Sequence, residues 1–172
     1  MEEEPVNINN NQGNLDEHTI VIRNKRLFNE LNGLIENPPN GIAVTYDRDD
    51  IISGDISRWV CYVTGPDDSA YEGITYQVNF YFPTEYPFSP PIVRFVTPIF
   101  HPNICSDGSV KITGLEDLWT PAMRMEHVLI SLQAMMGTPN ENDEDINNRE
   151  ALEVFYRDYD EYKSRVLRYN LE

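Results

Sequence analysis

The chain has 172 residues, of which 40% are hydrophobic and 11% aromatic, and this fits one globular domain with a sizeable core. Its 29 acidic and 13 basic residues give a formal net charge of -16, so we expect no nucleic-acid partner. The sequence lacks a long apolar run and a basic leader, and its two cysteines, Cys61 and Cys105, lack metal-ligand spacing. We therefore expect a soluble cytoplasmic, or also nuclear, protein with no membrane partner, metal or cofactor.

The first 17 residues differ in composition from the rest of the chain. Residues 1–17 hold five acids, lack Lys and Arg, and include the Asn-rich run 7–14. Such a composition buries too little apolar surface to offset the entropy lost on ordering. We predict a flexible acidic tail over 1–17 and one domain over 18–172.

An amphipathic helix is predicted from His18 to the breaker sequence at 37–41, NPPNG. Its apolar residues recur near helical spacing, at Ile20, Leu27, Leu31 and Leu34. The densest positive cluster in the chain, Arg23, Lys25 and Arg26, lies on this helix. A solvated helix face and a partner-docking face explain this cluster equally well.

Four segments of strand character follow, at 42–46, 59–64, 75–82 and 92–96. In the third, Tyr76, Val78 and Phe80 alternate with polar residues, a pattern typical of a sheet with one buried face. Short turn-rich links such as 65–68 favour an antiparallel meander over helical crossovers. Cys61 falls on the inward phase and is interpreted as a small core residue rather than a reactive thiol.

Residues 97–119 show little periodicity, which is typical of a functional loop. Thr120 and Pro121 then resemble a helix cap and first-turn proline, and apolar residues from Met125 to Met136 predict a buried central helix. Residues 147–172 predict one or two further helices, with a packing stripe of Leu152, Phe155, Tyr159, Tyr162 and Val166. The predicted fold class is α+β.

Three short motifs stand in order between these elements: 86–91 (YPFSPP), 101–103 (HPN) and 118–121 (LWTP). Each alone is an unspecific loop. Together, with the TPN sequence at 138–140, they resemble the core domain of ubiquitin-conjugating enzymes (UBC). The resemblance implies the UBC fold: an N-terminal helix, a four-stranded antiparallel meander sheet, a central helix and C-terminal helices. A longer connection at 49–57 departs from that family, and its role stays open.

The resemblance implies a catalytic cysteine eight residues after Asn103, and this chain has Lys111 there. The family's cysteine accepts ubiquitin as a thioester and passes it to a substrate lysine. An amine of pKa about 10.4 is mostly protonated at neutral pH, and an amide formed on it would be a dead end. We therefore expect no thioester transfer, and enzyme status stays uncertain. Thr113 and Gly114 also depart from the family, which favours a naturally changed site over an engineered one.

Other catalytic positions match the family unevenly. Asn103 corresponds to the family's asparagine, which either stabilises an oxyanion or braces the loop. His101 is interpreted as satisfying buried loop carbonyls. Asp143 matches an acidic residue that can orient the incoming lysine, although a merely solvated acidic loop also fits. Cys105, six residues before Lys111, is not expected to replace the missing thiol.

The family's binding surfaces are expected to persist. Phe88 resembles the aromatic residue that forms a ligase-docking patch with Pro121 and Ala122, an anchor type that concentrates binding energy. Lys25 and Arg26 match first-helix positions used by ligases and the activating enzyme.

Ile130 and Ala134 match the face of the central helix that holds donor ubiquitin, although ordinary packing explains Ile130 equally well. We therefore expect ubiquitin or a ubiquitin-like modifier, an activating enzyme and a ligase as partners of a monomeric chain. Two functions stay open: a conjugating-enzyme-like protein made inactive by Lys111, or a binding module that docks and regulates pathway components.

Overall fold

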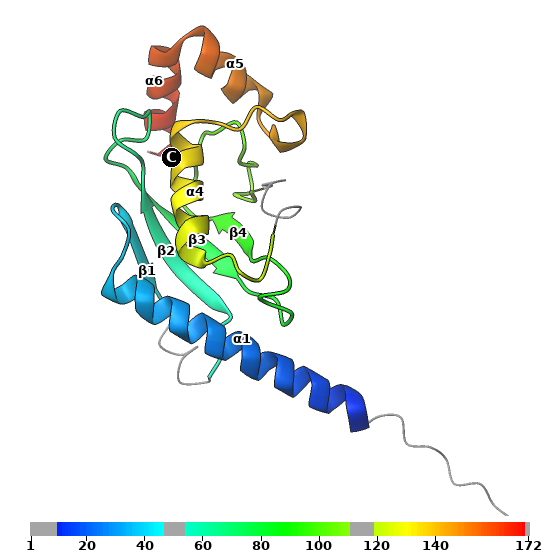
Figure 1. The fold of residues 1–172 in the computed structure, drawn as a ribbon. Helices are drawn as coiled ribbons and strands as arrows, with labels where there is room; N and C mark the ends of the chain where they lie inside the picture. Colours follow the sequence, from blue (N-terminus) through cyan, green and yellow to red (C-terminus); the bar gives the residue numbers. More distant parts are fainter. Residues whose placement is uncertain (1–9, 47–53, 111–118, 171–172) are drawn as a thin grey trace, which may run out of the picture.

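The computed structural model describes residues 10–46, 54–110 and 119–170 (Figure 1). It contains a long N-terminal helix, a four-stranded antiparallel sheet, a central helix and two C-terminal helices, so the predicted α+β fold is confirmed. In chain order the elements are α1 (Asn10–Glu36), β1 (Ile42–Thr45), β2 (Arg58–Thr64), β3 (Thr75–Tyr81), β4 (Ile92–Phe95), α4 (Met125–Gly137), η1 (Asp143–Asp145), α5 (Arg149–Arg157) and α6 (Tyr159–Tyr169).

The sheet is a simple meander in the order β1-β2-β3-β4 with every neighbouring pair antiparallel. Trp59 lies opposite Phe80 and Cys61 lies opposite Val78, and all four side chains are buried. The four predicted strands are confirmed, each boundary to within one residue. This agreement follows from the period of two, because a shift by one residue would turn the apolar side chains to solvent.

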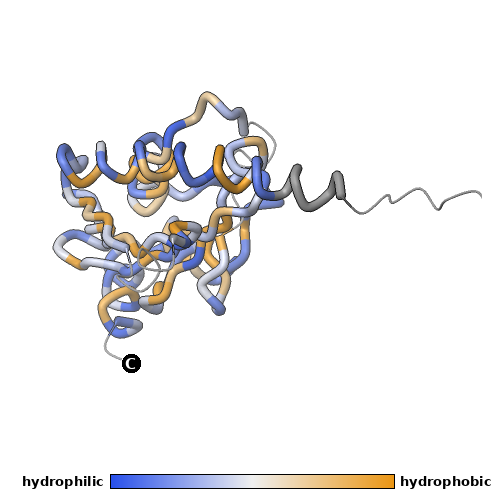
Figure 2. The backbone as a smooth tube through the Cα atoms, turned by 90° about the horizontal axis from the view of Figure 1, so that it is seen from below, coloured by the Kyte–Doolittle hydropathy of each residue, from blue (hydrophilic) through white to orange (hydrophobic). Residues whose placement is uncertain are grey.

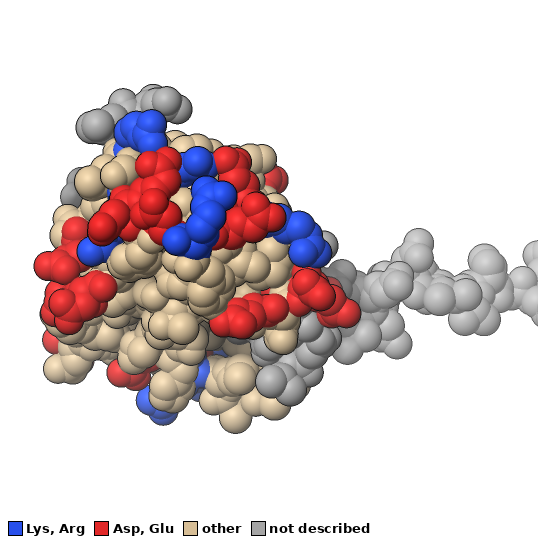
Figure 3. Space-filling view, turned by 90° about the horizontal axis from the view of Figure 1, so that it is seen from above, with Lys and Arg blue, Asp and Glu red and all other residues tan. Residues whose placement is uncertain are grey.

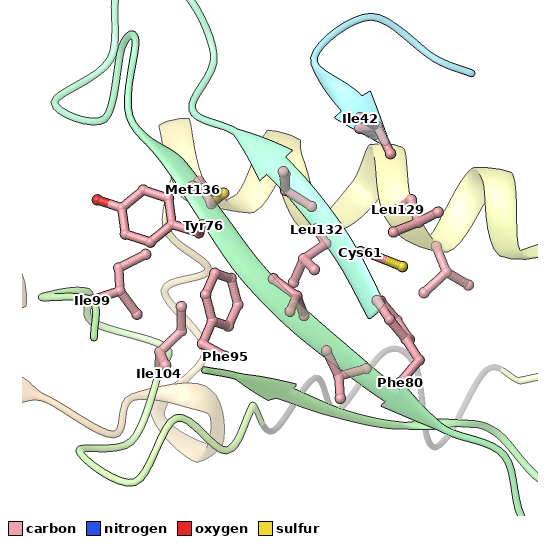
Figure 4. Packing of buried hydrophobic residues seen from close by; sticks show 14 of the residues in the cluster. Ile42, Cys61, Tyr76, Phe80, Phe95, Ile99, Ile104, Leu129, Leu132 and Met136 are labelled. Atoms are coloured by element: carbon pink, nitrogen blue, oxygen red, sulfur yellow. The ribbon is translucent and has the colours of Figure 1, made fainter. Parts of the chain in front are cut away.

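The core lies between the sheet and α4. Figure 4 shows Leu129, Leu132 and Met136 of α4 facing Cys61 and Tyr76 of the central strands. These side chains are at most 1% exposed. Cys61 is therefore a core residue, as predicted, and burial raises the pKa of its thiol to about 12.

Helix α1 packs one apolar stripe, which includes Leu27, Leu31 and Leu34, against the body of the domain. Figure 2 shows hydrophobic and hydrophilic residues alternating along this helix. It begins at Asn10, so residues 10–17, assigned from composition to a flexible tail, have helical backbone. The composition argument considered burial alone, whereas extending an existing helix adds one hydrogen bond for each residue fixed.

The start of α4 also differs from the sequence-based prediction. Thr120 and Pro121 were predicted to begin the helix, but the N-cap is Arg124 and residues 121 and 122 form a turn. The Arg124 side chain makes no cap hydrogen bond. The Glu30 carboxylate of α1 instead accepts the backbone N–H of Met125 at 2.6 Å.

The C-terminal part of the described chain forms two helices, α5 and α6, rather than one. Asn148 caps α5 through its side chain, and Asp158 caps α6 in the same way. Tyr162 and Val166 of the predicted stripe are buried, whereas on α5 Ala151 and Val154 face the core instead of Leu152.

Across the described residues, we find no helix with the length and apolar character needed to cross a bilayer.

Candidate functional site

The loop that begins at His101 is anchored by a buried imidazole. His101 is fully buried, its Nδ1 accepts the backbone N–H of Asn103 at 3.0 Å, and its Nε2 lies 3.0 Å from the carbonyl oxygen of Met135. The Nε2-protonated neutral ring satisfies both contacts. Burial lowers the pKa of this imidazole to about 4. His101 therefore joins the loop to the end of α4 as a neutral hydrogen-bonding group.

Asn103 is the most connected side chain of the loop. Its Nδ2 donates to the carbonyl oxygen of Asn140 at 2.7 Å and to that of Asp145 at 3.1 Å. Its Oδ1 accepts the backbone N–H of Asn140 at 2.9 Å, which sets the orientation of the amide. These contacts use both amide hydrogens, so the Asn103 side chain joins the loop to the carbonyl oxygens of Asn140 and Asp145.

A tight turn follows. The backbone N–H of Gly108 donates to the carbonyl oxygen of Cys105 at 2.9 Å, and Cys105 N–H donates to the Ser109 carbonyl oxygen at the same distance. Gly108 has φ +81°, and a Cβ there would lie 2.1 Å from the Phe95 carbonyl oxygen, so a side chain does not fit. Cys105 is a free, half-buried thiol held at this turn. Lys111 follows shortly after and lies outside the described residues.

Asp143 begins η1 at the acidic loop of residues 141–145. Its carboxylate is 3.6 Å from Arg149, and both side chains are well exposed. Its neighbour Asp145 is buried and accepts a hydrogen bond from the Asn140 side chain at 2.6 Å. Asp143 is therefore a solvated carboxylate, and Asp145 belongs to the bracing network around Asn103.

Phe88 is the most exposed large hydrophobic side chain among the described residues, at 70%. Pro121 and Ala122 are also exposed. The two loops that carry these residues are joined by Trp119, whose indole N–H donates to the Pro87 carbonyl oxygen at 2.7 Å. We call Phe88, Pro121 and Ala122 the Phe88 patch. Trp119 was noted only as part of a motif, and its linking role was missed because Pro87 lies 32 residues away in the sequence.

The three basic residues of the positive cluster on α1 differ in their exposure and contacts. Lys25 is exposed. Arg23 is 9% exposed, and its guanidinium lies 3.7 Å from Asp55, a residue of the 49–57 connection that departs from the family. Arg26 is half-buried and donates to Glu30 and, at 2.8 Å, to the carbonyl oxygen of Met123. Glu30 was not predicted as a site residue, although its place four residues after Arg26 on a helix is a signal for an ion pair.

The two residues predicted for the donor-ubiquitin face are both at the surface. Ile130 is 43% exposed, and Ala134, one helical turn further along α4, is exposed as well. They share a face with Glu126 and His127, which are also exposed. This placement separates them from the buried stripe of α4, so ordinary core packing does not account for Ile130.

The remaining described surface holds charged side chains and a hollow. Within the described ranges, no group of three or more His, Cys, Asp or Glu side chains is arranged to hold a metal ion. On the face drawn in Figure 3, Lys and Arg side chains lie interspersed with Asp and Glu. Ion pairs among the described residues include Arg165 with Glu150, and Arg165 with Glu161 at 2.8 Å. A hollow of about 460 Å³ between α1 and the start of α4 is lined by residues that include Arg26 and Glu30.

Comparison with known proteins agrees with this fold and loop arrangement. A family model described as "Ubiquitin-conjugating enzyme" matches residues 26–170. The chain is 33% identical over 153 residues to "Ubiquitin-conjugating enzyme E2-20 kDa" of Schizosaccharomyces pombe, covering 89% of this chain and 82% of the relative. It is 39% identical over 119 residues to "Ubiquitin-conjugating enzyme E2 13" of the same organism, covering 69% and 77%. The chain belongs to the ubiquitin-conjugating enzyme family, as its motifs predicted.

Proposed function

We propose that this chain is a ubiquitin-conjugating-enzyme-like protein that does not form the thioester and instead docks a ubiquitin ligase through the Phe88 patch. The observation that carries the proposal is the 70% exposure of Phe88, on a loop that Trp119 joins to the loop of exposed Pro121 and Ala122. Exposed aromatic anchors of this kind concentrate binding energy at protein interfaces. Activating enzyme and ubiquitin remain partners to be tested, because Lys25, Ile130 and Ala134 are exposed at the predicted contact positions.

Neither the two thiols of the chain nor Lys111 suits thioester formation. Thioester formation needs a thiolate that can reach the activated carbonyl of ubiquitin. Burial raises the pKa of Cys61 to about 12, so its thiol is neither ionised nor accessible. Cys105 is held by two backbone hydrogen bonds in a tight turn, six residues from the family's reactive position. The residue at that position, Lys111, is an amine, whose acylation would give a stable amide.

A charging assay tests the chemistry. The unaltered chain, Lys111→Cys and Lys111→Arg are each incubated with activating enzyme, ATP and ubiquitin and resolved with and without reductant. We expect a reductant-sensitive adduct on Lys111→Cys alone. Such an adduct on the unaltered chain would refute the proposed inactivity, and Cys105→Ser would then show whether that thiol carries it. If all three stay uncharged, the changes at Thr113 and Gly114 also oppose transfer.

A binding assay tests the docking role. Ubiquitin-ligase domains are titrated into the unaltered chain, Phe88→Ala and the control Ile92→Ala, whose side chain on β4 is 66% exposed but lies outside the Phe88 patch. We expect Phe88→Ala to weaken binding by about tenfold or more, the effect of removing an interface anchor. Ile92→Ala should leave the affinity unchanged. Equal effects of the two substitutions, or no binding by any ligase domain, would count against the Phe88 patch as a ligase site.

A further inference from the structure

One carboxylate on α1 contacts both loops that carry the Phe88 patch. Oε1 of Glu30 accepts the hydroxyl of Tyr86 at 2.9 Å and also receives Nε of Arg26. Oε2 accepts the backbone N–H of Met125 at 2.6 Å. Arg26 in turn donates to the carbonyl oxygen of Met123 at 2.8 Å. The side chain of Glu30 is only 10% exposed, so these bonds form with little competition from water.

These contacts lie next to the residues of the patch in both loops. Tyr86 is two residues before Phe88, and Met123 directly follows Ala122. The buried ring of Tyr86 also lies 5.8 Å from the ring of Trp119, which joins the loops by its hydrogen bond to Pro87. The backbone N–H of Phe88 donates to the Glu85 carbonyl oxygen at 2.7 Å inside the same loop, while the side chain is exposed over most of its surface. The position of this anchor relative to Pro121 and Ala122 therefore depends on the contacts between the two loops.

We infer that Glu30, held in place by Arg26, is a positioning residue that fixes the spacing between the two halves of the Phe88 patch. The inference rests on the proposed function, because it assigns Glu30 a role in the same docking site. A shared acceptor is an effective spacer, since its two oxygens hold one loop each and the ion pair to Arg26 orients the carboxylate. Arg26 therefore acts inside the domain, while Lys25 beside it stays free for a partner.

The replacement Glu30→Gln probes this geometry with little change in shape. An amide has one acceptor oxygen, whereas the carboxylate has two. If its NH₂ group replaces Oε2, the Met125 N–H loses its acceptor. If the NH₂ group replaces Oε1, Arg26 Nε loses its acceptor, and the Tyr86 hydroxyl must accept a hydrogen bond instead of donating one. Glu30→Ala removes both acceptors. Glu36→Ala is the matched control, because Glu36 is an exposed acid at the end of the same helix.

Amide hydrogen exchange measured by NMR tests the positioning directly and needs no ligase. In Glu30→Ala the Met125 amide should exchange roughly 10-fold to 100-fold faster, as expected for a lost bond to a charged acceptor. Shift changes should centre on residues 86–88 and 120–125, and Glu36→Ala should show neither effect. If Glu30→Ala does not fold, Glu30→Gln must still change the shifts of at least one of the two loops. An unchanged Met125 exchange rate and unchanged loops in a folded variant would overturn the inference.

Binding then distinguishes positioning from a general loss of stability. With a ligase domain that binds the unaltered chain, Glu30→Gln should weaken affinity about fivefold, but should add nothing in a Phe88→Ala background, because neighbouring changes that act on one site are not additive. Additive effects would show that Glu30 does not act through the patch. If no ligase domain binds the unaltered chain, the proposed function fails, and the exchange experiment alone decides whether Glu30 holds the two loops.

Discussion

The pH dependence of folding offers a direct test of the His101 geometry. The ring is fully buried and neutral, and its pKa is lowered to about 4 by desolvation. In the unfolded chain an imidazole binds its proton near pH 6.5. Between these two values the unfolded state binds more protons than the folded state, so stability falls as pH falls from about 6.5 to about 4. At 1.36 kcal/mol for each step of one in pKa, the loss amounts to about 3 kcal/mol.

The perturbation is His101→Gln, which keeps one donor and one acceptor but does not titrate. Free energies of unfolding are measured by urea titration, with tryptophan fluorescence as the signal, at pH 7 and pH 4. The drop between the two pH values should be about 3 kcal/mol larger in the unaltered chain than in His101→Gln. His127→Gln, an exposed histidine on α4, should behave like the unaltered chain. Equal drops in the unaltered chain and His101→Gln would refute the argument that a buried neutral imidazole makes the fold acid-sensitive.

Three further predictions concern the site loop and its surroundings. In the native chain at neutral pH, iodoacetamide should alkylate Cys105 but should reach Cys61 only after unfolding. The reason is that Cys61 is buried, which raises the pKa of its thiol to about 12. Rapid labelling of Cys61 in the native chain, detected by peptide mass mapping, would contradict this prediction. Asn103→Ala should lower the free energy of unfolding by about 2–4 kcal/mol, since it leaves buried loop groups without partners. A loss under about 0.5 kcal/mol in urea titration would mean that the amide does not brace the loop. Gly73→Ala should cost about 1 kcal/mol from its positive φ alone, whereas Gly108→Ala should cost about 3 kcal/mol or more because its Cβ would also strike a β4 carbonyl. Equal shifts in the two thermal midpoints would contradict that account.

Local sequence patterns predicted most of the architecture because they act over a few residues. Alternation along β3 placed Tyr76, Val78 and Phe80 on the buried face, and the structure has all three at 0% exposure. The spacing of Leu129 and Leu132 likewise identified the buried side of α4. The family motifs lie in loops, and their order along the chain sufficed to predict the family.

Features that depend on partners distant in sequence were not predictable from such patterns. Thr120 and Pro121 have the local form of a helix start, yet α4 begins at Met125. The Arg124 side chain does not cap the helix, and the carboxylate of Glu30, 95 residues away, accepts the Met125 N–H instead. The two explanations for Asn103 could not be separated in the sequence either. Both amide hydrogens bind backbone carbonyls 37 and 42 residues away, and no local pattern indicates these partners.

The wide separation of these partners bears on the order of folding. His101 and Asn103 are held by groups at residues 135, 140 and 145, so each of these bonds closes a segment of 34 residues or more. Contacts of that range form slowly, because the chain between them must be organised first. A peptide of residues 97–110 would hold the same side chains and none of these partners. We therefore expect the loop to be assembled late in folding, by the completed domain, and to lose its shape when it is transplanted as a short segment.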